Sequence, residues 1–228
     1  MKAIKKVIIF IILVFIVITT VVILQGYKMY KNAIDIISLD NKVAEIREDG
    51  NFTTINEIPT DYKNAVIAVE DHRFYTHNGI DIISIGRAIV TNIKSMDIVE
   101  GGSTITQQVA KNMYFSQKQE FTRKVAEIFL AFDLEKNYSK DEIFELYINT
   151  SYFGSGYYGI KEASNGYFNK EPIDMSISES TLIAGVPNAP SVYSPKENPE
   201  LAKQRQKKVI NAMVKYNYLS EEEAKQIE

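Results

Sequence analysis

The sequence has no cysteine and no tryptophan, and only two histidines among its 228 residues. The absence of cysteine excludes a disulfide framework, a thiolate nucleophile and a cysteine-ligated metal site. His72 and His77 are five residues apart, so they would not share a helical face, which argues against a zinc pair. A formal net charge of −3 gives no overall basic character, and we expect no nucleic-acid partner. A catalytic site would therefore depend on carboxylates and a local group of cations.

Charged residues are also absent from "VIIFIILVFIVITTVVIL", residues 7–24. As a helix this run would span about 27 Å, close to the ~30 Å hydrocarbon thickness of a bilayer. Three lysines precede it, which favours a cytoplasmic N-terminus. A cleaved signal peptide is the alternative, but the run exceeds the usual ~7–15 residues and no small-residue cleavage site follows. We therefore predict a cytoplasmic tail at residues 1–6, a single anchor in the cell membrane at residues 7–24, and an extracytoplasmic remainder.

Strand-like alternation of apolar and polar residues is nearly absent from the rest of the chain. Residues 25–54 show little periodicity and are interpreted as a stalk or linker, with one possible small hairpin near residues 42–54. Helical patterns and capping signals follow. They predict helices over residues 61–72, 81–94, from 104, 121–138, 139–150, up to about Gly185, and 198–228. The sequence thus indicates a mainly α domain at residues 55–228.

The densest ionisable cluster follows a short apolar turn in "AVIAVEDHRFYTHNG", residues 65–79. Glu70 comes directly after several apolar residues, and such neighbours disfavour the charged form of a carboxylate. A carboxylate with a higher affinity for protons suits a general base acting on a sugar hydroxyl. The ordinary alternative is a helix-end carboxylate paired with Arg73 or a histidine. The local sequence leaves both open.

A second cluster is cationic. Lys111 lies on the helix predicted after the Gly-Gly-Ser-Thr turn at residues 101–104, and Arg123 and Lys124 open the next helix. Glu127, four residues after Arg123, would by itself indicate an ordinary surface salt bridge. A helix N-terminus with hydroxyls and amide donors can, however, bind an anion. The turn is not a Walker P-loop, because no lysine follows the glycines at that spacing. Together the clusters suit a reaction in which a base activates a hydroxyl while cations stabilise a departing phosphate.

Five stretches, taken in order, resemble the motifs of the peptidoglycan glycosyltransferases, glycosyltransferase family 51, and particularly its monofunctional members. They are "EDHRFYTHNG", "GGSTITQQVAKN", "RKVAE", "KDEIFELYINTSYFG" and "LIAGVPNAPSVYSP". The resemblance covers about residues 55–215.

The resemblance implies a lysozyme-like, two-lobed α fold, with a head and a smaller jaw that touches the membrane. It implies polymerisation of lipid II into linear β-1,4 glycan strands by inverting transfer, with release of undecaprenyl pyrophosphate. Glu70 would be the base, and Glu127 would support the pyrophosphate side with a divalent cation, Mg²⁺ or Mn²⁺. The substrate-binding residues would be Asp71, Phe74, His77, Ser103, Thr104, Gln107, Gln108, Lys111, Lys118, Arg123 and Lys124. The loop near residues 95–102 would lie over the donor groove.

One position departs from the family pattern. The usual arginine four residues before the third motif is Gln119 here, and we expect the neighbouring Lys118 to take its place. No S-x-x-K followed by K-T-G occurs, so transpeptidase activity is not expected of this chain.

The expected partners are lipid II, the growing glycan strand, the membrane, and transpeptidases or other wall-synthesis proteins. Two other functions stay open: a lysozyme-like peptidoglycan hydrolase, and a catalytically silent membrane-tethered scaffold. The basic cluster and the anchor argue against the hydrolase, and the presence of Glu70 and Glu127 argues against the scaffold.

Overall fold

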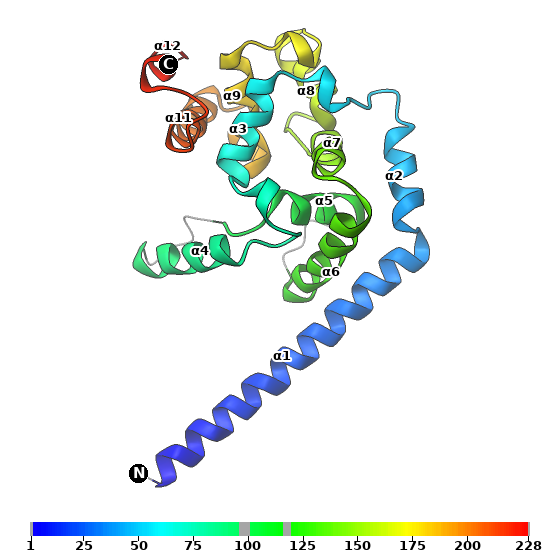
Figure 1. Ribbon diagram of the computed structural model, residues 1–228, viewed down its shortest axis with the longest axis vertical. Helices are drawn as coiled ribbons and strands as arrows, with labels where there is room; N and C mark the ends of the chain where they lie inside the picture. Colours follow the sequence, from blue (N-terminus) through cyan, green and yellow to red (C-terminus); the bar gives the residue numbers. More distant parts are fainter. Residues whose placement is uncertain (1, 96–100, 116–119, 228) are drawn as a thin grey trace.

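A computed structural model describes residues 2–95, 101–115 and 120–227 (Figure 1). These residues are predominantly helical and contain no strand, only two isolated β-bridges. The helices are α1 (Lys2–Ile36), α2 (Leu39–Arg47), α3 (Thr60–Glu70), α4 (Ile82–Ser95), α5 (Ile105–Tyr114), α6 (Phe121–Asn137), α7 (Lys140–Thr150), α8 (Gly159–Phe168), α9 (Ile177–Ala184), α10 (Pro190–Tyr193), α11 (Pro199–Lys215) and α12 (Glu221–Ile227). The mainly α prediction is confirmed.

The two predicted capping boxes are confirmed, whereas α3 begins at Thr60 itself, after Pro59, and has no side-chain cap. Thr104 precedes α5, where its hydroxyl accepts from the Gln107 backbone amide at 3.1 Å and the Gln107 side chain accepts from the Thr104 amide at 3.0 Å. The same reciprocal pair forms between Ser139 and Glu142 at the start of α7. Each pair satisfies two amides that have no partner inside the helix. Local sequence is therefore sufficient to begin these helices.

The predicted hairpin near residues 42–54 is wrong, because α2 occupies its first half. Ser38 caps α2, and Leu39 and Val43, four residues apart, are buried in the domain core. Residues that lie four apart share one helical face, so this short amphipathic pattern has a core to pack against. The segment interpreted as a stalk thus contributes to the core, and its first part, to Ile36, is a continuation of α1.

Two other boundaries differ from the predictions. Helix α3 ends at Glu70 rather than near residue 72, because Asp71 leaves the helical conformation and makes a contact with α5 described below. The predicted continuous helix over 198–228 is instead α11 and α12. The break contains Asn217 in the left-handed conformation, with φ 61°, which asparagine tolerates better than most residues.

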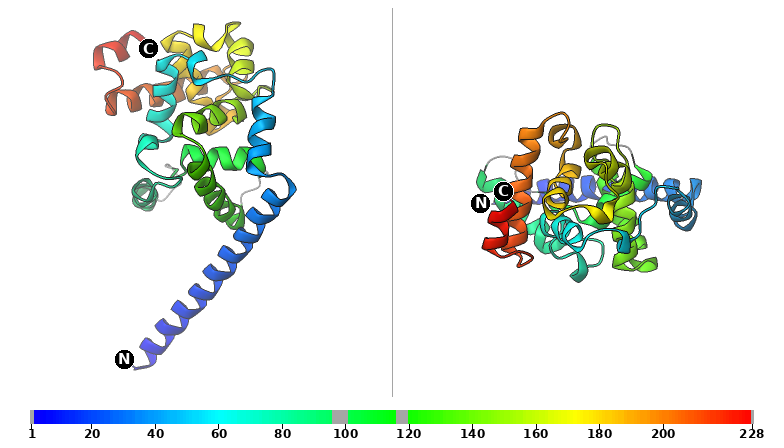
Figure 2. Two further views of the ribbon diagram at one scale, coloured as in Figure 1. Left: turned by 45° about the vertical axis from the view of Figure 1, so that its right-hand side comes forward. Right: turned by 90° about the horizontal axis from the view of Figure 1, so that it is seen from above.

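The core of the domain surrounds α3, which packs against α9 and α11, and α5, which packs against α6 and α7 (Figures 1 and 2). Tyr62 and Val66 of α3 and Phe144 and Tyr147 of α7 are fully buried in one apolar cluster. This packing fixes the C-terminal end of α3, where Glu70 lies.

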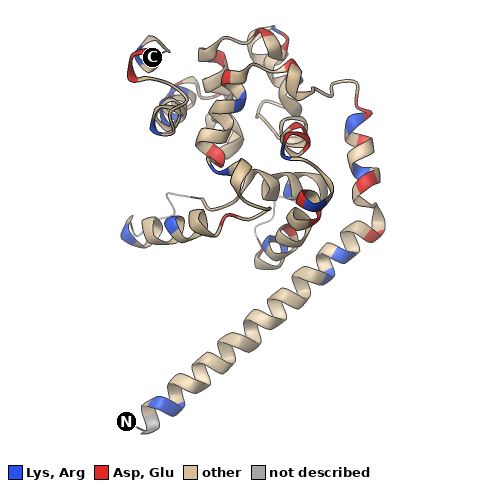
Figure 3. Ribbon diagram, in the orientation of Figure 1, with Lys and Arg blue, Asp and Glu red and all other residues tan. Residues whose placement is uncertain are grey.

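Helix α1 extends away from the rest of the chain as one long rod (Figures 1 and 2), and most of it carries no charge (Figure 3). It is the one helix among the described residues that is long and apolar enough to cross a membrane, from Ile4 to Ile36. Its C-terminal part packs on α6. The Tyr27 and Phe129 rings meet edge to face, with centroids 5.2 Å apart, and the Tyr30 hydroxyl donates to Asp133. The apolar helix is therefore joined directly to the domain.

Helix α4 is amphipathic but its apolar side is uncovered. Ile82 and Ile93 are 74% and 71% exposed, and Ile83, Ile89 and Val90 are exposed as well. In Figure 1, α4 projects beside the body of the domain, on the side toward which α1 extends. An uncovered apolar helix face of this kind is typical of a surface that meets lipid or another protein.

Candidate active site

A cavity of about 700 Å³ opens beside the C-terminal end of α3. Its walls come from α3, α4, α5, α11 and the turn at residues 101–104. The ionisable side chains that line it are Glu70, Asp71, His72, Asp81, Arg87, Lys111, Tyr193, Arg205, Lys208, Lys215 and Tyr216. Five of these side chains are Lys or Arg and three are carboxylates, and this excess of cations favours an anionic ligand.

Glu70 is the last residue of α3, and its side chain is only 8% exposed. The Gln108 side-chain amide donates to Oε2 at 2.9 Å, and the Arg205 guanidinium donates to Oε1 at 3.0 Å. Neither alternative partner predicted from the sequence, Arg73 or a histidine, makes a hydrogen bond or ion pair with Glu70 among these contacts. Both carboxylate oxygens are thus oriented by fixed donors at the wall of the cavity.

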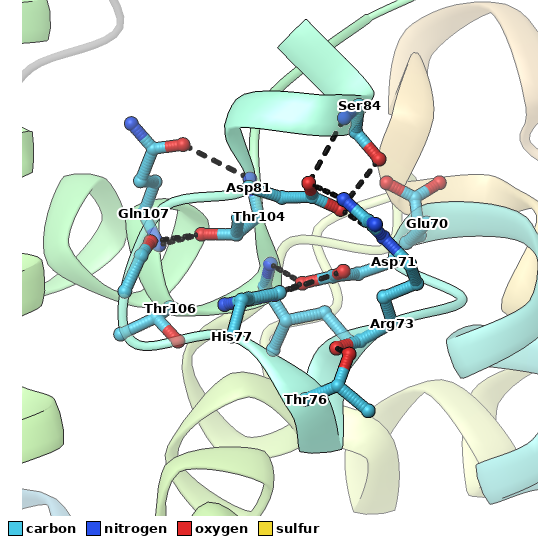
Figure 4. A network of polar contacts seen from close by, with 12 residues as sticks. Glu70, Asp71, Arg73, Thr76, His77, Asp81, Ser84, Thr104, Thr106 and Gln107 are labelled. Carbon is cyan, nitrogen blue, oxygen red and sulfur yellow. Dashed lines mark hydrogen bonds and ion pairs between the residues drawn. The ribbon is translucent and has the colours of Figure 1, made fainter.

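Asp71, the next residue, has a different environment (Figure 4). Its carboxylate accepts from the Ile105 backbone amide at 3.0 Å and lies 2.8 Å from His77 Nε2. These contacts join the end of α3 to the N-terminus of α5, where a carboxylate is favoured by the helix dipole. Asp71 therefore positions the two helices that carry Glu70 and Lys111.

His77 and Phe74 lie behind the cavity wall rather than on it. Phe74 is fully buried, with the Lys140 ammonium 4.6 Å from the centre of its ring. Of the residues predicted to shape the cleft around the base, Asp71 alone lines the cavity directly.

Thr104 and Gln107 also serve local structure. The Thr104 hydroxyl donates to the Gly79 carbonyl at 2.6 Å, while the Gln107 side chain is used in the cap of α5. Gly79 has φ 78°, and a Cβ there would lie 3.2 Å from the Ala131 backbone, so only glycine fits this turn without strain. Thr104 still lines the cavity, whereas Gln107 does not.

Helix α4 is attached to this region through Asp81. The Asp81 carboxylate accepts from the Ser84 amide at 2.9 Å and from the Ser84 hydroxyl at 2.6 Å, and it is ion-paired with Arg73 (Figure 4). The ion pair with Arg73 and the hydrogen bonds from Ser84 occupy the Asp81 carboxylate, so Asp81 is not available as a second base. The ion pair holds the exposed apolar helix at the rim of the cavity.

The predicted cationic cluster is assembled around Glu127, which is fully buried. Arg123 is ion-paired with one carboxylate oxygen, and Lys124 Nζ lies 2.8 Å from the other. Lys124 also donates to the Ser103 hydroxyl at 2.7 Å, and Ser103 lines the cavity. The ion-paired cluster is therefore linked to the cavity through the Ser103 side chain.

Lys111 reaches the cavity itself. Burial lowers the pKa of its ammonium group, an effect opposed by the charge of Glu127 and then reinforced by Arg123 and Lys124. Glu70 also acts on it, more weakly. Lys111 thus lies within electrostatic reach of both carboxylates, between the predicted base and the predicted pyrophosphate side.

The described residues do not provide a metal site by themselves. No group of three or more His, Cys, Asp or Glu side chains among them could hold a metal ion. Both oxygens of Glu127 already accept from cations. Three further predictions concern residues outside the described part of the chain: the role of Lys118, the substitution at Gln119, and most of the loop near residues 95–102.

The sequence did not predict that α11 forms one wall of the cavity. Arg205, Lys208 and Lys215 all line the cavity, at a spacing that puts them on one helical face. The spacing is visible in the sequence, but no local signal indicates that this face meets Glu70. Arg87 of α4 completes the group of unpredicted cations at the cavity.

Comparisons with known proteins agree with the geometry. The transglycosylase family model matches residues 40–214. The chain is 48% identical over 171 residues to penicillin-binding protein 1F of Bacillus subtilis, covering 75% of this chain and 24% of the relative. It is 46% identical over 193 residues to penicillin-binding protein 1A of Neisseria lactamica, covering 84% of this chain and 24% of the relative.

The chain thus spans about a quarter of the length of these curated relatives. A crystal structure of penicillin-binding protein 1A from Haemophilus influenzae aligns over 77% of this chain and 17% of that one, with 21% identity and a TM-score of 0.46. Because the family model matches most of its sequence, including every residue that lines the cavity up to Ala212, the chain belongs to the transglycosylase family.

Proposed function

We propose that this chain is a peptidoglycan glycosyltransferase that polymerises lipid II into linear β-1,4 glycan strands. The observation that carries the proposal is the position of Glu70, a carboxylate held by two donors at the wall of a cavity that several cationic side chains also line. Family membership supports the same activity. The substrate follows from the resemblance of the motifs and from the apolar N-terminal helix, which suits a lipid-linked donor.

In the proposed reaction, Glu70 accepts the proton of the acceptor sugar's 4-hydroxyl. The resulting oxygen nucleophile attacks the anomeric carbon of the donor, and the bond from that carbon to the pyrophosphate oxygen breaks. Attack from the face opposite the leaving group inverts the anomeric configuration. The proton remains on Glu70 and the electron pair leaves with undecaprenyl pyrophosphate, so the step is balanced without a general acid.

The departing pyrophosphate needs cations rather than an acid. Lys111 is placed to contact it directly, and its partly desolvated surroundings strengthen a charge interaction. Glu127 fixes Arg123 and Lys124 behind Ser103, so that these side chains form a preorganised positive group. Glu127 acts here as a structural anion that orients cations.

The divalent cation expected from the resemblance, Mg²⁺ or Mn²⁺, stays a prediction. It would supply Lewis-acid stabilisation of the pyrophosphate charge. Because both Glu127 oxygens are paired with cations, such an ion would be held chiefly by oxygens of the substrate.

We also propose that the N-terminus is cytoplasmic and the domain extracytoplasmic, in the cell membrane. The three lysines before the apolar run support this orientation. The exposed isoleucines of α4 would then rest on the bilayer beside the cavity mouth. Transpeptidases remain expected partners, because polymerised glycan needs cross-linking and this chain has no motif for it.

A lysozyme-like hydrolase is the second candidate, and the site argues against it. A glycosidase requires two carboxyl groups that flank the scissile bond. Glu127 is fully buried and does not line the cavity, while Asp71 and Asp81 are committed to His77, Ile105, Arg73 and Ser84. Glu70 is therefore the acid group that the described cavity offers to a sugar.

The test is incubation of the purified chain, in liposomes, with labelled lipid II. A polymer that lysozyme digests supports the proposal, provided that the Glu70→Gln variant makes none. Soluble fragments released from purified cell wall would instead indicate a hydrolase. Neither product from the folded wild-type chain would favour a silent scaffold.

A further inference from the structure

Arg205 of α11 contacts the predicted base across 135 positions of sequence. Its guanidinium lies 3.0 Å from Glu70 Oε1, and the two side chains are 12% and 8% exposed. Both line the same cavity. A charge-assisted hydrogen bond in such a partly buried place is stronger than one between neutral groups.

The arginine is itself held in place by the end of α9. Its Nε donates to the Gly185 carbonyl at 3.3 Å, and the guanidinium carbon lies 5.8 Å from the centre of the Tyr193 ring. A Cβ on Gly185 would lie 2.7 Å from Arg205 Cγ. Because Gly185 has no side chain, there is space for the Arg205 side chain to extend to Glu70.

The other groups around Glu70 differ in kind from Arg205. Gln108, from α5, is neutral and donates to the second carboxylate oxygen. Lys111, also from α5, and the buried phenol of Tyr147, from α7, interact with Glu70 electrostatically. Arg205 is the cation that the structure places in direct contact with the carboxylate.

We propose that Arg205 is a positioning residue for the reaction: its guanidinium holds the Glu70 carboxylate at Oε1 and so aims Oε2 at the acceptor hydroxyl. This inference depends on the proposed glycosyltransferase function. Oε1 accepts from the Arg205 guanidinium and Oε2 from the Gln108 amide, so the two donors together fix the plane of the carboxylate at the cavity wall. A neutral replacement for Arg205 would leave the buried carboxylate more easily protonated, and a protonated carboxyl group cannot accept the hydroxyl proton.

The test compares Arg205→Gln and Arg205→Lys with wild type in the full-length chain, using lipid II as substrate. Lys207→Gln, on the exposed side of α11, is the matched control. The rates are measured as kcat and KM from about pH 5 to pH 9. Thermal unfolding of each variant establishes that it is folded.

The expected result for Arg205→Gln is a fall in kcat of about 10- to 100-fold near neutral pH, the effect of one charge-assisted hydrogen bond. KM should change little. Because loss of the cation favours protonated Glu70, the acidic limb of the kcat/KM profile should move to higher pH. The deficit should therefore be largest in acid and should shrink as pH rises, and Arg205→Lys should recover much of the activity.

Several results would overturn the inference. A loss of activity equal at every pH, with no recovery in Arg205→Lys, would show that Arg205 is merely a structural link between α3 and α11. A rise in KM alone would show that it binds substrate. If Arg205→Gln does not fold, Gly185→Ala displaces the arginine while keeping its charge, and an unchanged profile in that variant would also count against the inference.

The inference and the proposed function can fail separately. If the folded wild-type chain makes no glycan polymer, the proposed function fails whatever Arg205 does. If wild type makes polymer and Arg205→Gln keeps the wild-type profile, only the role of Arg205 is lost.

Discussion

Glu70 and Glu127 are two largely enclosed carboxylates, and both are ion-paired. Glu127 takes its partners from its own helix, three and four residues away. Glu70 takes its ionic partner from α11, 135 residues away. Only Glu70 lines the cavity, while Glu127 is enclosed behind Ser103. The comparison shows that burial and pairing alone do not distinguish the proposed base from a structural carboxylate, whereas contact with the cavity does.

The difference also separates activity from stability. A fully buried carboxylate with two cationic partners leaves uncompensated charge when it is neutralised. Neutralising a carboxylate at the cavity wall would remove its proposed chemical role. It should cost less stability, because water in the cavity can partly solvate the cation that it leaves behind. The predictions below test this contrast, from the largest expected effect to the smallest.

Glu70→Gln should lower the rate of glycan polymerisation by about 10²–10⁴, the usual contribution of a general base. The amide keeps the shape of the side chain but cannot accept the hydroxyl proton. The measurement is product formation from labelled lipid II at saturating substrate. A variant that retains more than a tenth of the wild-type rate would remove Glu70 from this role.

Glu127→Gln should lower the free energy of unfolding by about 3–5 kcal/mol, more than Glu70→Gln does, because Arg123 and Lys124 lose their shared anion. Thermal unfolding of the purified chain checks this, with Glu70→Gln as the matched variant. If Glu70→Gln is the less stable of the two, the contrast between the carboxylates is wrong.

Lys111→Ala should reduce kcat/KM for lipid II by about 10- to 100-fold, because one charge-assisted contact to the pyrophosphate is lost. Since burial lowers the pKa of Lys111, its charge should disappear as pH rises, at a lower pH than for an ordinary lysine at 10.5. Wild-type activity should therefore fall in alkaline solution, and Lys111→Arg should keep activity there. An identical alkaline decline in both would mean that another group titrates.

Gly26→Ala should destabilise the chain by about 1–3 kcal/mol, the usual cost of overpacking. A Cβ there would lie 2.5 Å from Val125 Cβ, next to Lys124 on α6. The matched control is Gly86→Ala in α4, where a Cβ meets nothing within 4 Å. Thermal unfolding compares the two variants. Equal stability would show that α1 is not closely packed against α6, the helix that carries Glu127.

Several parts of the fold could be read from local sequence. Thr104 with Gln107 and Ser139 with Glu142 marked two helix starts, because a capping box is completed within four residues. The same locality made the Arg123–Glu127 pair predictable. The misread segments were less clear: α2 has a serine cap but is too short to show a clear period, and α3 ends where Asp71 turns to the Ile105 amide of another helix.

The sequence by itself determined the apolar anchor, most of the helices and the two groups of candidate residues. Each of these depends on side-chain spacing within a few turns of one helix. The tertiary structure alone decided which carboxylate faces the cavity, which cation holds it, and that α11 forms the cavity wall. The physical reason is that the Glu70–Arg205 contact arises from the packing of α3 against α9 and α11, and Gly185 leaves it room. Glu70 and Arg205 meet only when those helices pack together, so the spacing of residues along the chain does not predict their contact.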